Sequence, residues 1–450
     1  MPATIFFVLY SGFRLSVLCV CVILFPVNGR RINLRYPEFL KEGGRVGFIA
    51  PSFGCTTEPY RTLFENAVKY FKAGGYETVT GPNCFKSDGC GKSSTPENCA
   101  AEINDFFLND RCDVIISCGG GETMCEDLDL TDLEAMKKAV PKWYMGYSDN
   151  TNLIFPLTTV CDTAAVYGPN ASAFGTDPVH PSVADAFNVL TGKSLSVSNY
   201  DKWEKEEPGE DAPLTAPYNC TEPFDLKVFD FSKNREIPEP GKDSVRFSGR
   251  LVGGCLDCLV LHCGTKFDNT VSFAEKYKED GIIWFIESCD LNPMGIRRAL
   301  WQLSNAGWFR YVKGFIIGRA YHYDDAFMGM NRINAVTGIL SKYGVPVLLD
   351  ADLGHLPPMM PIVSGALCDV ESIGGSLRLT NALLCNILVD LAVPFFISVK
   401  GSLPVSDTID HFFLLLNPQK QKQRCKQQIH KLEFSRISEP VCITGIRKPQ

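Results

Sequence analysis

Short apolar runs alternate with amphipathic helical patterns along most of this 450-residue chain. An apolar run at Val46–Ala50 precedes a helical pattern at Glu58–Ala73, and Gly74 and Gly75 end that pattern before the next run at Glu77–Thr80. Strands that alternate with helices form parallel sheets covered by crossover helices, with ligand sites at the carboxyl ends of the strands. The sequence therefore predicts an α/β fold with a Rossmann-like N-terminal domain.

The alternation stops near residue 198 and resumes after Gly249. Between them, the segment Asp201–Asp211 is charged and aperiodic, which indicates an inserted loop. After Gly249, apolar runs at Gly281–Ile286 and Val345–Asp350 predict a second α/β domain. We therefore expect a signal peptide or membrane anchor at 1–29, domains at 41–180 and 249–383, a linker with an inserted loop at 181–248, and an appended, disordered tail at 386–450.

One serine lies at the end of an apolar strand and just before a helical pattern at Thr151–Thr159. In Gly146-Tyr147-Ser148-Asp149, a sharp turn would expose the hydroxyl of Ser148, and the positive end of the helix would face charge developing beside it. This arrangement is typical of a nucleophile. The alternative is that Ser148 and Asp149 only cap the helix.

A glycine turn, Gly119-Gly120-Gly121, follows another predicted strand. It lacks the spacing of a nucleotide-binding loop, because neither Gly-x-Gly-x-x-Gly nor the Lys-Ser/Thr of a P-loop is present. Free backbone N–H groups at Gly120 and Gly121 would instead join that of Asp149 in an oxyanion hole, or bind a substrate carboxylate.

A carboxylate and a histidine stand at the ends of two strands in the second predicted domain. Glu287 follows the strand Ile282–Ile286, and His355 lies in a Gly/Pro loop after Val345–Asp350. A base and a group that orients it are what a serine nucleophile needs, so we predict an active site where the two domains face each other. The alternatives are a loop histidine packed on prolines and a Glu287 paired with a nearby arginine.

These motifs together resemble the LD-carboxypeptidase family, including its branch of microcin C immunity peptidases. The resemblance rests on the Gly-Tyr-Ser-Asp turn, the strand-end glutamate and the Gly-His loop, and it covers about residues 41 to 383. Further motifs in family order are Ala50-Pro51-Ser52-Phe53, Gly119-Gly120-Gly121-Glu122, Tyr167-Gly168-Pro169, Gly249-Arg250-Leu251-Val252-Gly253-Gly254-Cys255-Leu256 and Gly318-Arg319.

The resemblance implies a serine carboxypeptidase with Ser148, His355 and Glu287 as its triad, acting without a cofactor or metal. It implies short peptide substrates, either muropeptides or peptidyl-adenylates, and a homodimer. The long loop bearing Trp203 looks more like the immunity branch, so we expect Trp203 to stack on substrate; the alternative is that it anchors its own loop. A non-catalytic binding protein that retains the cleft is the rival interpretation, and Ser148 argues against a cysteine-dependent amidotransferase.

Charge and the N-terminal sequence bear on partners and location. The formal net charge of −7 offers no basic field for nucleic acid, so we expect no nucleic-acid partner. An apolar core at 15–26 follows Arg14 and precedes Val27-Asn28-Gly29, which predicts a signal peptide and a secreted or endomembrane-lumen protein. A retained membrane anchor is the alternative, because Ile5–Tyr10 extends the apolar stretch.

Of the nineteen cysteines, Cys19 and Cys21 lie in the predicted signal segment; in an oxidising compartment some of the others could pair, although their connectivity cannot be read from sequence. Cys84, Cys90 and Cys99 are candidates for disulfides, whereas Cys118 and Cys289 are expected to be buried core thiols. Cys255-Leu256-Asp257-Cys258 has redox-motif spacing, but we favour structural packing, because no second cysteine pair or histidine cluster completes a zinc site. The triplets starting at Asn170 and Asn219 would be glycosylation acceptors in a secreted chain.

Overall fold

The computed structural model describes residues 4–8, 20–24, 34–233 and 244–383. The chain divides into two units, of which one is Leu34–Leu383. In the other, the described strands β1 (Thr4–Val8) and β2 (Val20–Leu24) pair antiparallel. The signal segment predicted at 1–29 lies largely outside the described residues, and the tail predicted at 386–450 lies wholly outside them. No helix within the described ranges is long and apolar enough to cross a membrane.

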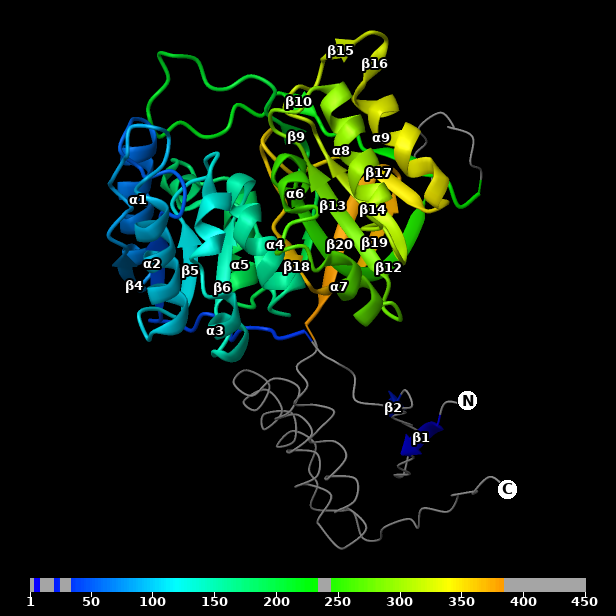
Figure 1. Cartoon of the computed structure of the whole chain (residues 1–450), viewed down its shortest axis with the longest axis horizontal. Helices are drawn as coiled ribbons and strands as arrows, with labels where there is room; N and C mark the ends of the chain where they lie inside the picture. The colour runs from blue at the N-terminus through cyan, green and yellow to red at the C-terminus, as the bar shows by residue number, and fades with distance from the viewer. Residues whose placement is uncertain (1–3, 9–19, 25–33, 234–243, 384–450) are drawn as a thin grey trace, which may run out of the picture. The chain divides into compact units, whose positions relative to one another are not determined.

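The first sheet of the unit Leu34–Leu383 has six strands in the order β18-β7-β6-β5-β3-β4 (Figure 1). All are parallel except β18, which runs antiparallel to β7. The strands are β3 (Arg45–Ile49), β4 (Glu77–Thr80), β5 (Val114–Ser117), β6 (Trp143–Gly146), β7 (Ala165–Tyr167) and β18 (Ile362–Ser364). Their helices are α1 (Tyr60–Ala73), α2 (Pro96–Leu108), α3 (Leu133–Lys138), α4 (Thr151–Thr159) and α5 (Pro181–Leu190), with short 3-10 turns η1 (Met124–Asp129), η2 (Ser148–Asn150) and η3 (Ala171–Gly175).

The second sheet has eight strands in the order β11-β17-β14-β13-β12-β19-β20-β8. Its centre, from β12 to β17, is parallel, and the strands at both sides are antiparallel. The strands are β8 (Ser196–Ser198), β11 (Lys227–Asp230), β12 (Val245–Cys255), β13 (Ile282–Glu287), β14 (Val312–Gly318), β17 (Pro346–Ala351), β19 (Leu367–Ile373) and β20 (Ser376–Ala382). The helices are α6 (Leu256–His262), α7 (Thr270–Lys276), α8 (Pro293–Asn305) and α9 (Arg332–Leu340), which the 3-10 turn η4 (Ser341–Tyr343) follows. The small hairpins are β9 (Lys202–Trp203) with β10 (Glu222–Pro223), and β15 (Ala326–Phe327) with β16 (Met330–Asn331).

The predicted α/β class with parallel-strand sheets is confirmed, but the chain crosses between the sheets more often than the sequence suggests. Strand β18 comes from the second half of the chain and completes the first sheet. Strands β8 and β11 come from the segment expected to be a linker and loop, and they form the two edges of the second sheet. Such short edge strands have too few residues to show a period of two, so their sequences resemble loops.

Helix α4 belongs to the first half of the chain but packs on the second sheet. Every residue of α4 is buried, and Phe155 stacks on Trp308 with ring centroids 5.1 Å apart. Gly254 in β12 has φ +147°, and a Cβ there would lie 2.5 Å from the side chain of Thr151, so only glycine permits this approach. The hydroxyl of Thr151 accepts a 3.0 Å hydrogen bond from the N–H of Cys255. These contacts hold the turn before α4 against the end of β12.

Candidate active site

The turn that carries Ser148 is strained. Ser148 follows β6 and has φ +62°, a left-handed conformation that non-glycine residues adopt rarely and mostly at functional sites. The side-chain amide of Asn150 steadies the turn by donating to the carbonyls of Tyr147 and Gly119, both at 2.9 Å. The helix-cap alternative is wrong, because the side chain of Ser148 caps neither η2 nor α4. A strained strand-to-helix turn is how a serine nucleophile is exposed.

Ser148, His355 and Glu287 form a continuous hydrogen-bonded chain. The hydroxyl of Ser148 lies 2.9 Å from Nε2 of His355, and Nδ1 of the same ring lies 2.8 Å from Oε2 of Glu287. Ser148 comes from the first sheet, Glu287 ends β13, and His355 lies in the loop after β17. Glu287 therefore pairs with the histidine and not with a neighbouring arginine. The structure brings together the three residues that the sequence singled out.

Burial and charge set the ionisation of this chain. Burial by itself would raise the pKa of Glu287, but the charge and hydrogen bond of His355 outweigh burial and lower that pKa. Burial lowers the pKa of His355, but the Glu287 carboxylate and contact with Cys289 hold it well above its ordinary value. Glu287 is 1% exposed, so little water screens this attraction. The carboxylate thus stabilises a positively charged imidazole.

Two contacts of the triad were missed from sequence. The hydroxyl of Tyr167 donates to Oε1 of Glu287 at 2.5 Å and accepts from the N–H of Ser148 at 3.1 Å. Burial raises the pKa of Tyr167 well above its ordinary value, which keeps this donor protonated. The motif Tyr167-Gly168-Pro169 marked Tyr167 as a residue shared with the family, but the sequence did not indicate that its hydroxyl bonds both Glu287 and Ser148. Cys289, expected in the core, is only partly buried and lies against His355.

The predicted oxyanion residues lie beside Ser148. A Cβ on Gly120 would stand 3.2 Å from the Ser148 hydroxyl, which shows how closely the glycine turn approaches. Gly120 and Gly121 both line the pocket in front of Ser148. The carboxyl of Asp149 is turned away from the pocket, because it accepts from the hydroxyl of Ser52 at 2.5 Å and from the N–H of Met124 at 2.9 Å. The carboxyl group of Asp149 is therefore not available to a substrate.

Trp203 does not reach the substrate space, and the expectation that it stacks on substrate is wrong for this structure. Its ring is 5% exposed, packs on Tyr323 at 5.0 Å and covers the guanidinium of Arg319 at 4.9 Å. Its indole N–H donates to the carbonyl of Pro223 at 3.1 Å. The alternative, that Trp203 anchors its own loop, is the one that fits. The charged sequence around Trp203 suggested exposure, but pairing of β9 with β10 buries the ring.

Arg319 holds the histidine loop. Its guanidinium lies 2.6 Å from the carboxyl of Asp352 and donates to the carbonyls of Leu356 and Pro358, at 3.2 and 3.4 Å. Asp352 accepts a further hydrogen bond from the N–H of Tyr200 at 2.7 Å. Arg319 and Asp352 are both buried. The loop that presents His355 is thus fixed on both sides of the histidine.

A pocket of about 740 Å³ opens in front of Ser148. One wall comes from the glycine turn and the start of α1, and the opposite wall from the loop 204–218, which arches toward α1 (Figure 1). His355 and Gly354 line the pocket beside Ser148. The space suits a peptide-sized ligand.

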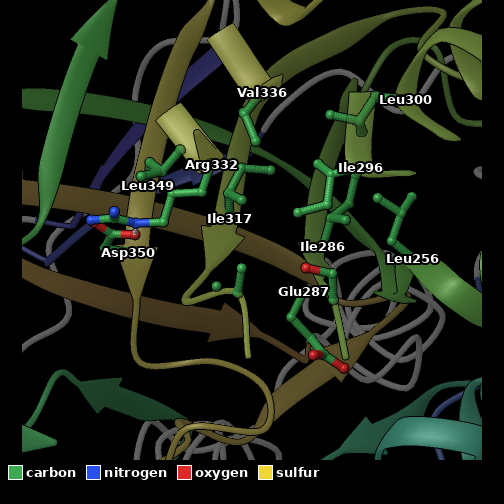
Figure 2. Close-up of a pocket in the computed structure, with 13 residues that line it drawn as sticks. Leu256, Ile286, Glu287, Ile296, Leu300, Ile317, Arg332, Val336, Leu349 and Asp350 are labelled. Carbon is green, nitrogen blue, oxygen red and sulfur yellow. Dashed lines mark hydrogen bonds and ion pairs between the residues drawn. The ribbon is translucent and has the colours of Figure 1, made fainter. Parts of the chain in front are cut away.

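A second cavity, of about 20 Å³, lies behind Glu287 (Figure 2). Aliphatic side chains such as Ile286, Ile296 and Ile317 line it, and the Arg332–Asp350 ion pair, at 2.8 Å, closes its far end. Figure 2 shows Glu287 directing its carboxyl group away from this aliphatic cluster. The cavity therefore backs the carboxylate with apolar groups and leaves it to interact with His355 and Tyr167.

The described cysteines are free thiols. Cys84 donates to the carbonyl of Phe48 and Cys99 lies 3.4 Å from the Ser93 hydroxyl, so the disulfides expected around Cys84, Cys90 and Cys99 are absent from the described residues. Cys258 is buried against the carbonyl of Ser148 at 3.7 Å, as structural packing predicts. No group of three or more His, Cys, Asp or Glu side chains in the described ranges could hold a metal ion.

Asn170, the first residue of a candidate glycosylation triplet, is 6% exposed and lines the pocket. Its side-chain oxygen accepts from the N–H of Tyr147 at 3.3 Å and from the amide of Asn150 at 3.2 Å. In this position Asn170 is part of the site wall and is not an accessible glycan acceptor.

Known proteins resemble about three quarters of the chain. A protein of Vibrio cholerae with a provisional carboxypeptidase name is 26% identical over 72% of this chain and 91% of its own length. The microcin C7 self-immunity protein MccF of Escherichia coli is 25% identical over 77% of this chain and 95% of its own. The structure of MccF in complex with glutamyl sulfamoyl guanosine superposes with a TM-score of 0.64 at 23% identity, covering 78% of this chain and 99% of that one.

Family models match both halves of the chain. Residues 46–168 match the N-terminal domain of LD-carboxypeptidases, and residues 248–370 match the C-terminal domain. The two matches contain Ser148, Glu287 and His355 and together span more than half of the sequence. The chain belongs to the LD-carboxypeptidase family of peptidases.

Proposed function

We propose that this protein is a serine carboxypeptidase that hydrolyses an amide bond in short peptides, with Ser148 as nucleophile, His355 as general base and acid, and Glu287 as the group that orients the histidine. The observation that carries the proposal is the hydrogen-bonded chain from Ser148 through His355 to Glu287, at 2.9 and 2.8 Å. Its geometry matches what acyl transfer by a serine requires.

In the acylation step, the Ser148 hydroxyl attacks the scissile carbonyl and gives its proton to Nε2 of His355. The buried Glu287 carboxylate stabilises the imidazolium, and backbone N–H groups of Asp149 and the Gly120 turn receive the negative oxygen. His355 then protonates the leaving amine as the C–N bond breaks. A water molecule, deprotonated by the same histidine, hydrolyses the ester and restores Ser148.

The substrate class is proposed from the family and from the pocket. Structures of MccF contain glutamyl sulfamoyl guanosine and aspartyl sulfamoyl adenosine, which favours peptidyl nucleotides for this chain as well. The LD-carboxypeptidase match favours peptides of mixed stereochemistry such as muropeptides. Mass spectrometry of products from a tetrapeptide mixture and from a peptidyl-adenylate analogue decides between them.

Covalent labelling tests the nucleophile independently of the substrate. A serine-directed phosphonate should modify Ser148 of the full chain, and peptide mapping should locate the adduct there. The Ser148→Ala and His355→Ala variants should not react. Modification at another residue, or an unreactive wild-type protein, would favour the rival function of a binding protein that keeps the cleft without chemistry.

A further inference from the structure

Asn170 lies on the wall of the pocket in front of Ser148 and takes no part in the triad. It directly precedes η3, and only 6% of the residue is exposed. Its side chain bonds the turn that carries the nucleophile, through the N–H of Tyr147 and the amide of Asn150. The contacts that shape the turn at Ser148 therefore also fix the position of Asn170.

The amide group of Asn170 has only one orientation that satisfies its neighbours. Its oxygen Oδ1 accepts from the N–H of Tyr147 at 3.3 Å and from Nδ2 of Asn150 at 3.2 Å. The Asn150 amide cannot be reversed, because its nitrogen also donates to the carbonyls of Tyr147 and Gly119. A reversed Asn170 amide would turn its NH2 group against two donors. The oxygen of Asn170 therefore faces the turn, and Nδ2 faces away from it.

Nδ2 of Asn170 is a donor without an acceptor. It forms no hydrogen bond within the described residues, although amide donors in mostly buried residues normally find a partner. The nitrogen is not sealed from solvent, and the residue lines the same pocket as Ser148. This donor is therefore available to a ligand in the pocket.

Gly120 leaves a space between Asn170 and the nucleophile. A Cβ on Gly120 would stand 3.2 Å from the hydroxyl oxygen of Ser148 and 3.9 Å from Nδ2 of Asn170. That point is open because residue 120 is a glycine. A substrate oxygen in this space, next to the Ser148 hydroxyl, also comes within reach of Nδ2.

The backbone of Ser148 cannot supply a donor to the same oxygen. Its N–H donates to the hydroxyl of Tyr167 at 3.1 Å and is therefore occupied. The proposed backbone donors are the N–H groups of Asp149 and the Gly120 turn. Side-chain amides of asparagine serve alongside backbone N–H groups in oxyanion holes. Two donors on Oδ1 of Asn170 also polarise its amide, which strengthens Nδ2 as a donor.

We propose that Asn170 is a catalytic residue, whose Nδ2 donates a hydrogen bond to the carbonyl oxygen of the substrate as that oxygen becomes negative. This proposal rests on the proposed peptidase function. Because Tyr147 and Asn150 already orient the amide, it needs no rearrangement when the charge develops. Removal of one side-chain donor of this kind lowers kcat by about 10²-fold or more. Asn170→Ala should lower kcat by that factor and change KM little.

Labelling with a fluorophosphonate tests the donor without a known substrate. The Ser148 oxygen bonds to phosphorus, fluoride leaves, and the hydroxyl proton passes to His355, while the phosphoryl oxygen takes the place of the substrate oxygen. Asn170→Ala should slow this labelling by about tenfold or more, as expected for loss of a hydrogen bond to a charged group. Asn109→Ala is the matched control, because Asn109 is an exposed asparagine at the end of α2, and it should label at the wild-type rate.

Asn170→Asp separates a donor from a residue that only positions the turn. Aspartate keeps an oxygen for the N–H of Tyr147 and the amide of Asn150, but it has no amide donor and brings a negative charge. If Asn170 acts as a donor, the aspartate variant should be as slow as the alanine variant or slower, with a near-native melting temperature. If aspartate restores the rate that alanine loses, Asn170 only positions the turn and the inference is overturned.

The remaining outcomes distinguish this inference from the proposed function. Equal labelling rates in the wild type and Asn170→Ala would overturn the role of Asn170 and leave the peptidase function intact. A rise in KM with unchanged kcat would also overturn it, because Nδ2 would then bind the substrate before reaction and not the developing charge. If wild-type Ser148 is not labelled at all, the peptidase function and the role of Asn170 fall together.

Discussion

The two loops that meet in the site are built in different ways. The turn at Ser148 has a strained backbone, with φ +62°, and its hydrogen-bond partners, such as Asn150, Tyr167 and Asn170, all come from the first half of the chain. The loop at His355 is held by distant residues: Arg319 reaches the carbonyls on its far side, and Tyr200 and Glu204 bind its two ends. The first loop carries local backbone strain, whereas the second depends on a few residues that are far from it in sequence.

This difference indicates which substitutions should affect the chemistry and which should displace a catalytic residue. The turn at Ser148 has several hydrogen-bond partners, so substitution of the Ser148 side chain itself should act on chemistry and leave the turn in place. The histidine loop has several remote supports, so substitutions at those supports should act on the position of His355 without touching a reacting atom. The following predictions test this contrast.

Ser148→Ala should have the largest effect. Loss of the nucleophile should lower turnover by about 10³-fold or more, by analogy with other triad deletions, because acylation has no alternative acceptor. The fold should be unaffected, because the hydrogen bonds from Asn150 go to backbone carbonyls, which the substitution does not remove. Steady-state kinetics and circular dichroism measure both. Turnover close to wild type would show that Ser148 is not the nucleophile.

Glu287→Gln should lower the rate and also move its pH dependence. The neutral form of His355 is the base, and its pKa is held above the ordinary 6.5, so kcat/KM should fall as pH drops through this raised value. Without the carboxylate, the main cause of the raised pKa is gone, and the acid limb should shift to lower pH. The maximal rate should fall by about 10²-fold or more, because the imidazolium loses its partner. If the acid limb of the kcat/KM profile does not shift in Glu287→Gln, a group other than His355 causes it.

Arg319→Lys should have an intermediate effect that comes from the histidine loop alone. Lysine keeps the charge beside Asp352 but cannot also bond the carbonyls of Leu356 and Pro358. We expect kcat to fall about tenfold with a small change in KM, since displacement of a catalytic group is costly even at short distances. Arg298→Lys is the control, because Arg298 is exposed on α8. If kcat falls equally in Arg319→Lys and Arg298→Lys, Arg319 does not position the histidine loop.

The same contrast explains what the sequence predicted. Ser148, Glu287 and His355 could be found because each comes shortly after an apolar strand, and Ser148 and His355 also lie close to a glycine, so that the local pattern is informative. Tyr167, Asn170 and Arg319 could not be assigned roles, because each acts through partners brought close only by folding. The edge strands β8 and β11 were missed for a related reason, since pairing and not their own sequence makes them strands.

Trp203 is the residue on which local pattern and tertiary structure disagree most, and it makes the smallest predicted change in catalysis. Its burial against Arg319 and Tyr323 predicts that Trp203→Ala destabilises the protein, by about 3 to 5 kcal/mol if the site does not collapse. Below the unfolding transition, kcat/KM should fall only a few-fold, and equally for a peptidyl-adenylate and a tetrapeptide, because the ring touches neither. Trp301→Ala, which removes a tryptophan 59% exposed on α8, should leave stability nearly unchanged. A fall in kcat/KM for the adenylate alone would instead mean that the loop rearranges and brings Trp203 onto a nucleobase. Trp203 would then leave Arg319, so the histidine loop would lose part of its support whenever substrate binds.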